Sequence, residues 1–350
     1  MFDMIVVGSG AGGGAAAWAL AQRGQKVLIL EAGPWFDPDR DYGLDKPDWE
    51  QHSFPVKPRS QGRYTYGEMQ KLDPKWKDLR GWHRDEISSE MPERRKVAIG
   101  YSHVRGVGGS TLHYVGEAHR MHPRSMRLAS QFGVGADWPM GYDELEPYYA
   151  KVEQLIGVAG EHRGPLGPAT QDPSERWRST PYPLPAHRLC PASQQLARGA
   201  QALGMNWQPN PRAALSEAYD GRPPCNHCGG CAKGCPRRDK GSVDQTFIPK
   251  ALATGRCEIL PNAQVTRLLH NRLREVTGVE YIDAKGRVQQ ARARGVVLAA
   301  GAIETPRILL ANRSPWAPQG IGNDHGQVGR HFLETVYWMS VGLHPDRLDS

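Results

Sequence analysis

The stretch MIVVGSGAGGGAAAWALAQRGQKVLILEAG, residues 4–33, sets a short apolar run before a glycine-rich turn, an alanine-rich segment and a second apolar run. This order predicts a β-α-β unit. Gly8 permits the tight turn, Gly10 lets a pyrophosphate approach the backbone, and Gly13 lets the helix pack on the strand. Gly24 then stops the helix. The second strand ends at Glu31, whose carboxylate can accept hydrogen bonds from ribose hydroxyls. The pattern therefore predicts a dinucleotide site, for FAD or NAD rather than NADP.

The composition is that of a globular chain with many turns. It has 350 residues, 39% of them hydrophobic, with 40 Gly and 28 Pro, and no internal repeat. The formal net charge is +7, but acidic and basic residues are interspersed, so we expect no nucleic-acid partner.

No stretch approaches the ~20 apolar residues that a transmembrane helix needs. The N-terminus runs directly into the first strand and lacks the basic region and cleavage site of a signal peptide. We therefore expect no transmembrane segment, a cytoplasmic location and reduced cysteines.

Two further glycine-rich segments carry chemical information: RGVGGSTLHYVGEAHR (105–120) and GVVLAAGAIETPRILLAN (295–312). The first is a turn whose backbone can lie against a flat ring or a phosphate. The second predicts a buried strand, a glycine turn and a helix with Pro306 in its first turn. Between residues 257 and 299 the pattern predicts a β-meander with a turn at 283–286.

Together with WPMGYDELEPYYAKVEQLIGVAG (138–160) and GQVGRHF (326–332), these segments resemble the glucose-methanol-choline (GMC) family of FAD-dependent oxidoreductases, in its sugar and polyol (gluconate-dehydrogenase-like) branch. The resemblance implies an α/β fold, with a Rossmann-like FAD-binding domain that includes a β-meander and an interleaved α+β substrate domain. We expect the discontinuous FAD-binding domain at 1–33, 95–125 and 255–332. The substrate domain would take 34–94, 126–254 and 333–350, with a Cys-rich loop at 225–236.

The resemblance also implies which residues contact FAD: Gly8, Gly10, Gly13, Glu31, Ala32, Gly108, Gly109, Ser110, His113, Val265, Ala300 and Gly301. Val265 would meet the adenine through its backbone. His113 stands where some relatives carry the histidine that bonds covalently to the flavin, so it is either such a link or a packing or flavin-contact residue.

The run CNHCGGCAKGCP (225–236) holds four of the six cysteines. The spacing of Cys225, Cys228, Cys231 and Cys235 matches the bacterial ferredoxin run, in which the fourth cysteine serves a second cluster. Relatives in this branch carry similar cysteines, some with an iron–sulfur cluster and some with none known. Four interpretations stay open: an iron–sulfur cluster, structural zinc, a disulfide, or unligated thiols.

Three more residues near or outside this run have default interpretations. Cys190 and Cys257 are expected to be small buried hydrophobic residues. Lys240 is expected to be a solvated surface lysine, with a neighbour of the substrate or of an iron–sulfur cluster as the alternative.

By resemblance, the full-length activity is oxidation of an alcohol, sugar or polyol by hydride transfer to the flavin. The electrons would pass to an acceptor other than NAD, such as a cytochrome or a small subunit, and export to the periplasm with a partner subunit is an alternative location. The family's catalytic histidine and its paired His or Asn follow the 326–332 segment, where this sequence has little room. We therefore assign no catalytic residue and expect a fragment or a split gene, inactive alone. The alternative is a non-catalytic or split flavin-binding or metal-stabilised module that needs a second polypeptide.

Overall fold

The computed structural model describes residues 1–42, 104–162, 166–167, 177–205, 207–231 and 234–332. The chain divides into two compact units. Unit 1 contains Met1–Val115 and His227–Arg330, and unit 2 contains Gly116–Asn226. The expected domain boundaries that fall at 94–95 lie outside the described residues, and the expected division stays a prediction.

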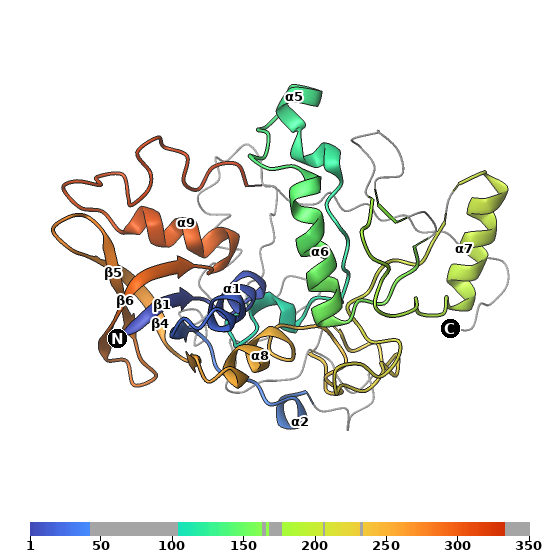
Figure 1. The fold of residues 1–350 in the computed structure, drawn as a ribbon, viewed down its shortest axis with the longest axis horizontal. Coiled ribbons are helices and arrows are strands. Elements are labelled where there is room, and N and C mark those ends of the chain that lie inside the picture. The colour runs from blue at the N-terminus through green and yellow to red at the C-terminus, as the bar shows by residue number, and fades with distance from the viewer. Residues whose placement is uncertain (43–103, 163–165, 168–176, 206, 232–233, 333–350) are drawn as a thin grey trace, which may run out of the picture. The chain divides into compact units, whose positions relative to one another are not determined.

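Unit 1 is built on a six-stranded sheet of order β3-β2-β1-β6-β5-β4 (Figure 1). Its strands are β1 (Phe2–Val7), β2 (Val27–Leu30), β3 (Cys257–Leu260), β4 (Gln264–His270), β5 (Val276–Ile282) and β6 (Val288–Leu298). β1 pairs in parallel with β2 and β6, and β2 with β3. β4, β5 and β6 form an antiparallel meander, which confirms the predicted β-α-β unit and β-meander.

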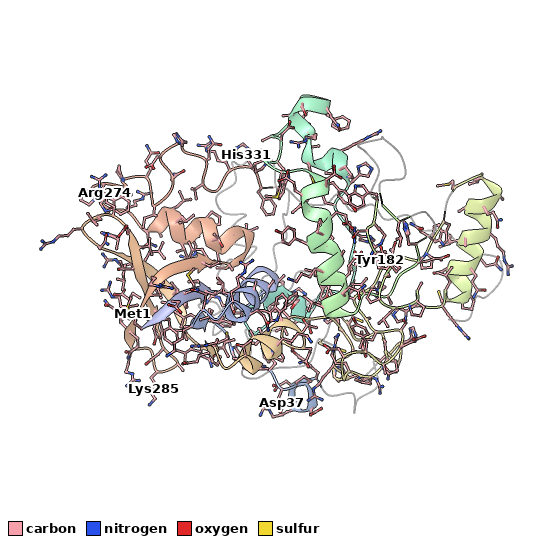
Figure 2. All side chains as sticks on the ribbon, viewed as in Figure 1. Met1, Asp37, Tyr182, Arg274, Lys285 and His331 are labelled. Atoms are coloured by element: carbon pink, nitrogen blue, oxygen red, sulfur yellow. The ribbon has the colours of Figure 1, made fainter. Side chains whose placement is uncertain are left out.

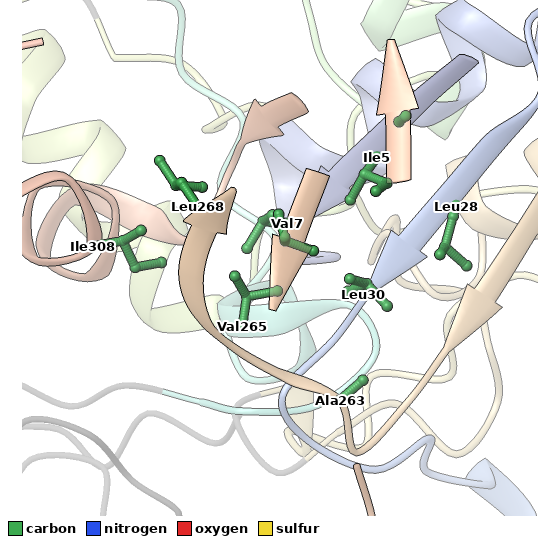
Figure 3. Packing of buried hydrophobic residues seen from close by; sticks show 10 residues of the cluster. Ile5, Val7, Leu28, Leu30, Ala263, Val265, Leu268 and Ile308 are labelled. Atoms are coloured by element: carbon green, nitrogen blue, oxygen red, sulfur yellow. The ribbon is translucent and has the colours of Figure 1, made fainter. Parts of the chain in front are cut away.

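Both faces of β2 and of the second half of β1 are buried, as expected for a sheet covered by helices on each side. One face contributes Ile5, Val7, Leu28 and Leu30, which pack with Val265, Leu268 and Ile308 (Figure 3). The residues between them, Val6, Val27 and Ile29, pack on the other face with alanines of α1 (Ala11–Gln22) and α8 (Phe247–Ala253). The alternation along each strand thus places α9 (Gly301–Ala311) and α1 in opposite layers.

Short elements and turns complete the description of unit 1. α1 follows Gly10, and Gly24, with φ of 81°, ends it as predicted. The turn before the meander's last strand forms at 283–286, where the Gly286 N–H donates to Asp283 O at 2.9 Å. The short helix α2 (Pro38–Asp41) and the 3-10 helix η2 (Gly109–Leu112) also belong to this unit.

Unit 2 contains the 3-10 helix η3 (Pro123–Met126) and the helices α5 (Leu128–Phe132), α6 (Tyr142–Ile156) and α7 (Pro191–Ala202). Buried ion pairs hold α6. Arg120 donates to both oxygens of Glu153, at 2.8 and 2.9 Å, and to Glu146 at 2.8 Å. Arg178 also pairs with Glu153. These charges are buried and mutually compensated, so removal of one would leave its partners uncompensated.

Candidate functional site

A cavity of about 320 Å³ opens at the carboxyl ends of the parallel strands of unit 1. Three turns line it: the turn from β1 into α1, the segment at the start of η2, and the turn from β6 into α9. In open α/β sheets, ligands bind at this edge.

The first turn requires its glycines. Gly8 has φ of 93°, and a Cβ on it would lie 2.6 Å from Ala299 O. A Cβ on Gly13 would overlap Gly8 O. Gly10 is different, because its Cβ would meet only Gly109 Cα, at an ordinary 3.8 Å. Gly8 and Gly13 therefore serve the fold, whereas Gly10 leaves backbone open to the cavity.

Ser9 joins the first two turns to the acidic residue at the end of β2. Its Oγ donates to Glu31 Oε2 at 2.6 Å and accepts from the Gly108 N–H at 3.2 Å. The Ser9 N–H also donates to Oε2, at 3.0 Å, and the Gly33 N–H donates to Oε1 at 2.9 Å. Ser9 thus fixes both the Glu31 carboxylate and the start of η2.

Glu31 lies in the cavity wall and is only 5% exposed. Burial raises the pKa of its carboxyl group, and the hydrogen bonds from Ser9 and Gly33 oppose that shift. Oε2 accepts two of these bonds and Oε1 one. Because each carboxylate oxygen has two lone pairs, Oε1 can still accept a hydrogen bond from a ligand hydroxyl.

The third turn leads into α9. Gly301 has φ of 90° and no atom would lie within 4 Å of an added Cβ, so its conformation, not crowding, favours glycine. Glu304, one turn into α9, pairs with Arg307 through Oε2 at 2.7 Å. Its other oxygen, Oε1, is buried with no hydrogen-bond partner among the described residues.

Nine of the twelve predicted cofactor residues line the cavity: Gly8, Gly10, Glu31, Ala32, Gly109, Ser110, Val265, Ala300 and Gly301. Three do not. Gly13 is buried in α1, Gly108 precedes η2 with φ of 109°, and His113 is the half-buried residue that ends η2. The roles of all twelve toward a cofactor stay predictions.

The cavity also contains polar residues that the sequence alone did not identify: Ser9, Arg105, Gln264 and Glu304. Arg105 is 5% exposed, and its Nη1 donates to Gln264 Oε1 at 3.4 Å. The available signal was position, since Arg105 is the first residue of the glycine-rich segment 105–120 and Gln264 directly precedes Val265.

These features fit a dinucleotide. Neither α1 nor α9 has a side-chain cap at its N-terminus, and α1 has no acidic residue in its first turn. Backbone N–H groups at these helix starts are therefore available to phosphates. Oε1 of Glu31 can take a ribose hydroxyl. The turn from β1 into α1 and the start of η2 approach each other closely, since a Cβ on Gly109 would lie 2.8 Å from Gly10 Cα.

The cysteine run is not grouped as a metal site. Within the described ranges, no three His, Cys, Asp or Glu side chains are placed so that they could hold a metal ion. Cys225, Cys228 and Cys231 are half-buried, and Cys235 is buried, with burial raising the pKa of its thiol to about 11. All six cysteines of the chain lie in the described residues, and no two of them form a disulfide. A metal site on Cys225, Cys228, Cys231 and Cys235 stays a prediction.

Two default interpretations were wrong, and one was right. Cys257 is buried as expected, but Cys190 is exposed, because it precedes the first turn of α7. Lys240 is not a surface lysine: it is fully buried.

None of the helices in the described part of the chain is long and apolar enough to span a membrane. The fold is similar to that of a solved structure, pyridoxine 4-oxidase from Mesorbium loti, which is 21% identical, with a TM-score of 0.51 and coverage of 89% of this chain and 52% of that one.

Curated relatives cover almost the whole chain. It is 30% identical to the fructose dehydrogenase large subunit of Gluconobacter japonicus, over 95% of this chain and 58% of that protein. It is 29% identical to 2-methyl-1,2-propanediol dehydrogenase of Mycolicibacterium austroafricanum, over 95% of this chain and 55% of that protein. The chain thus spans little more than half the length of these relatives. The model of the GMC oxidoreductase family matches residues 3–334, and the chain belongs to that family.

Proposed function

We propose that this chain binds FAD in the cavity of unit 1 and forms the flavin-binding part of an enzyme that oxidises an alcohol, sugar or polyol. The observation that carries the proposal is the convergence of three glycine turns and Glu31 on one cavity. The relatives' names support the substrate class, since they include a fructose dehydrogenase and a propanediol dehydrogenase.

In this proposal, the residues that line the cavity hold the cofactor. The N-terminal turn of α1 at Gly10 takes the pyrophosphate, and Glu31 Oε1 takes a ribose hydroxyl. The Val265 backbone contacts the adenine, and Gly109 and Ser110 lie along the flavin. When bound, the flavin accepts the hydride from the carbinol carbon, and the protein aligns that carbon and chooses the electron acceptor. We propose an acceptor other than NAD, such as a cytochrome or a small subunit.

Gly10 provides the sharpest test. Its φ of −69° suits any residue, and an added Cβ makes only an ordinary contact within the chain. We expect Gly10→Val to remove FAD binding while the unfolding transition of the flavin-free chain stays unchanged, because the added methyl groups occupy the phosphate position. Gly199→Ala, a helical glycine of α7 with open space around it, is the matched control. A Gly10→Val variant that retains FAD with unchanged affinity would contradict the proposal.

The alternative is a non-catalytic or split module that binds flavin but needs a second polypeptide. Visible absorbance distinguishes the two. Bleaching of the bound flavin by an alcohol, sugar or polyol supports the enzyme, whereas bound flavin that no such compound reduces supports the module.

Two finer predictions remain attached to this proposal. An iron–sulfur cluster on the cysteine run predicts iron and acid-labile sulfide in near-equal amounts, zinc predicts metal without sulfide, and unligated thiols predict neither. The location, cytoplasmic or periplasmic with a partner subunit, is tested by cell fractionation.

A further inference from the structure

Lys240, four residues after the cysteine run ends, is a fully buried lysine. Its Nζ donates to three main-chain carbonyl oxygens: Cys231 O at 2.7 Å, Leu112 O at 2.9 Å and Tyr114 O at 3.0 Å. A lysine ammonium has three N–H donors. Each donor therefore has a carbonyl partner, which compensates for the loss of water around a buried charge.

The three acceptors come from two places that the sequence separates widely. Leu112 and Tyr114 flank His113, directly after the part of η2 that lines the cavity. Cys231 belongs to the cysteine run. One ammonium thus joins the backbone directly after the cavity-lining residues of η2 to the backbone of the cysteine run.

Neighbouring bonds tie the same two segments together. The Tyr114 Oη donates to Gly241 O at 3.2 Å, and the Val243 N–H donates to Thr111 Oγ1 at 3.1 Å. The Tyr114 ring also lies 5.2 Å from Lys240 Nζ, within the range of a cation–π interaction. The segment after the cysteine run is therefore bonded to Thr111, which lines the cavity, and to Tyr114, which follows the cavity-lining residues.

The cysteine run is anchored on another side by residues near α2. A Cβ on Gly234 would lie 2.5 Å from the Tyr42 ring. Tyr42 in turn packs with Phe36 and Leu112 in one apolar cluster. Arg238 donates to both carboxylate oxygens of Asp39, at 3.0 and 2.6 Å, and Asp37, labelled in Figure 2, begins the same short helix.

We propose that Lys240 is a positioning residue: its ammonium holds the backbone on both sides of His113 in place and locks the cysteine run onto this segment, directly after the cavity-lining part of η2. The conformation of the run and the flavin environment are then coupled through one side chain. The flavin part of this proposal rests on the proposed function, but the lock itself does not require a bound flavin.

The test replaces Lys240 in the whole chain and measures both ends of the lock. Lys240→Met keeps the length of the side chain and removes its donors. Lys240→Arg keeps the charge, but a planar guanidinium cannot match three carbonyls placed around one point. Lys285→Met, at an exposed turn residue, is the control.

The first measurement is the labelling rate of Cys231 by a small thiol reagent in the flavin-free chain, resolved by mass spectrometry. We expect Lys240→Met to raise this rate by about tenfold or more, since charge-assisted hydrogen bonds are lost. Labelling of Cys257, which is buried in β3, should stay unchanged, because general unfolding would raise both rates. Lys240→Arg should resemble Lys240→Met.

The second measurement is the visible circular dichroism and the dissociation constant of added FAD. We expect an altered flavin spectrum and about tenfold weaker binding in Lys240→Met, and neither in Lys285→Met.

If Lys240→Met does not fold, Tyr114→Phe, which removes the bond to Gly241, should give the same changes at smaller size. Unchanged Cys231 labelling in a folded Lys240→Met variant, or in Tyr114→Phe where Lys240→Met does not fold, overturns the lock. A changed labelling rate with an unchanged flavin spectrum overturns the coupling. If the wild-type chain binds no FAD, the proposed function fails, and Cys231 labelling still decides the lock.

Discussion

The turn at residues 8–13 and the cysteine run at 225–236 are both glycine-rich, but their glycines have different neighbours. At Gly8 and Gly13, an added Cβ would meet backbone atoms that cannot move aside. Around Gly229 there is nothing within 4 Å, whereas Gly234 is crowded by a side chain, Tyr42. In the turn at residues 8–13, the spacing of the glycines follows from the close approach of backbone atoms. In the cysteine run, the spacing of the cysteines permits several structures. The contact with Lys240 is made by the carbonyl of Cys231 rather than by its thiol.

The largest effect we expect is at Gly13. Gly13→Ala should lower the free energy of unfolding by about 4 kcal/mol or more, in the range reserved for severe overpacking, because its Cβ would overlap Gly8 O. Gly12→Ala is the matched control, since it is in the same helix with open space around it. That change should stabilise the flavin-free chain by up to about 1 kcal/mol. Denaturant titration measures both changes in the free energy of unfolding. Equal effects of Gly13→Ala and Gly12→Ala would remove the distinction between the turn at 8–13 and the cysteine run.

A second pair sharpens the comparison inside the cysteine run. Gly229 and Gly234 both have positive φ, 68° and 95°, so alanine at either position carries a left-handed strain of about 1–2 kcal/mol. Only Gly234 faces the Tyr42 ring. We expect Gly234→Ala to cost about 1 kcal/mol more than Gly229→Ala, from overpacking. Equal costs in denaturant titration would show that the Tyr42 contact does not anchor the run.

The sequence predicted the parts of the fold whose signals are local. The β-α-β unit, the end of α1 at Gly24 and the turn at 283–286 each depend on neighbours along the chain. The burial of Lys240 does not depend on neighbours along the chain, because its partners at 112, 114 and 231 come together only in the folded unit. For the same reason the sequence identified the glycines of the cavity but missed Ser9, whose role comes from Glu31 and Gly108. Hydrophobic periodicity carries no information on such polar links.

Thiol reactivity compares the cysteine run with cysteines outside it. Burial raises the pKa of the Cys235 and Cys257 thiols to about 11, while the Ser193 hydroxyl at 3.3 Å lowers the pKa of exposed Cys190. Because the thiolate is the reactive form, Cys190 should be labelled first at about pH 8. Cys235 and Cys257 should be slow, and their rates should rise about tenfold per pH unit up to their pKa. Cys235 labelled as fast as Cys190 would show that the run opens in solution.

The smallest effect is expected at a turn held by a side chain instead of by crowded glycine. Asp283 Oδ1 accepts from the N–H groups of Lys285 and Arg287, both at 2.9 Å, and Oδ2 pairs with Arg287 at 2.9 Å; Lys285 is labelled in this turn in Figure 2. The backbone bond from Arg287 is the main cause that lowers the pKa of Asp283 to about 2. A depressed carboxyl pKa contributes stability that is present above the unfolded value of 3.8 and is lost as the pH falls toward 2. We therefore expect Asp283→Asn to lower the free energy of unfolding slightly above about pH 4, where the carboxylate contributes, and the difference from the wild type to vanish as the pH falls toward 2. A carboxyl titration followed by NMR checks the value, and an Asp283 that titrates near its unfolded value would show that this turn is not held by its side chain.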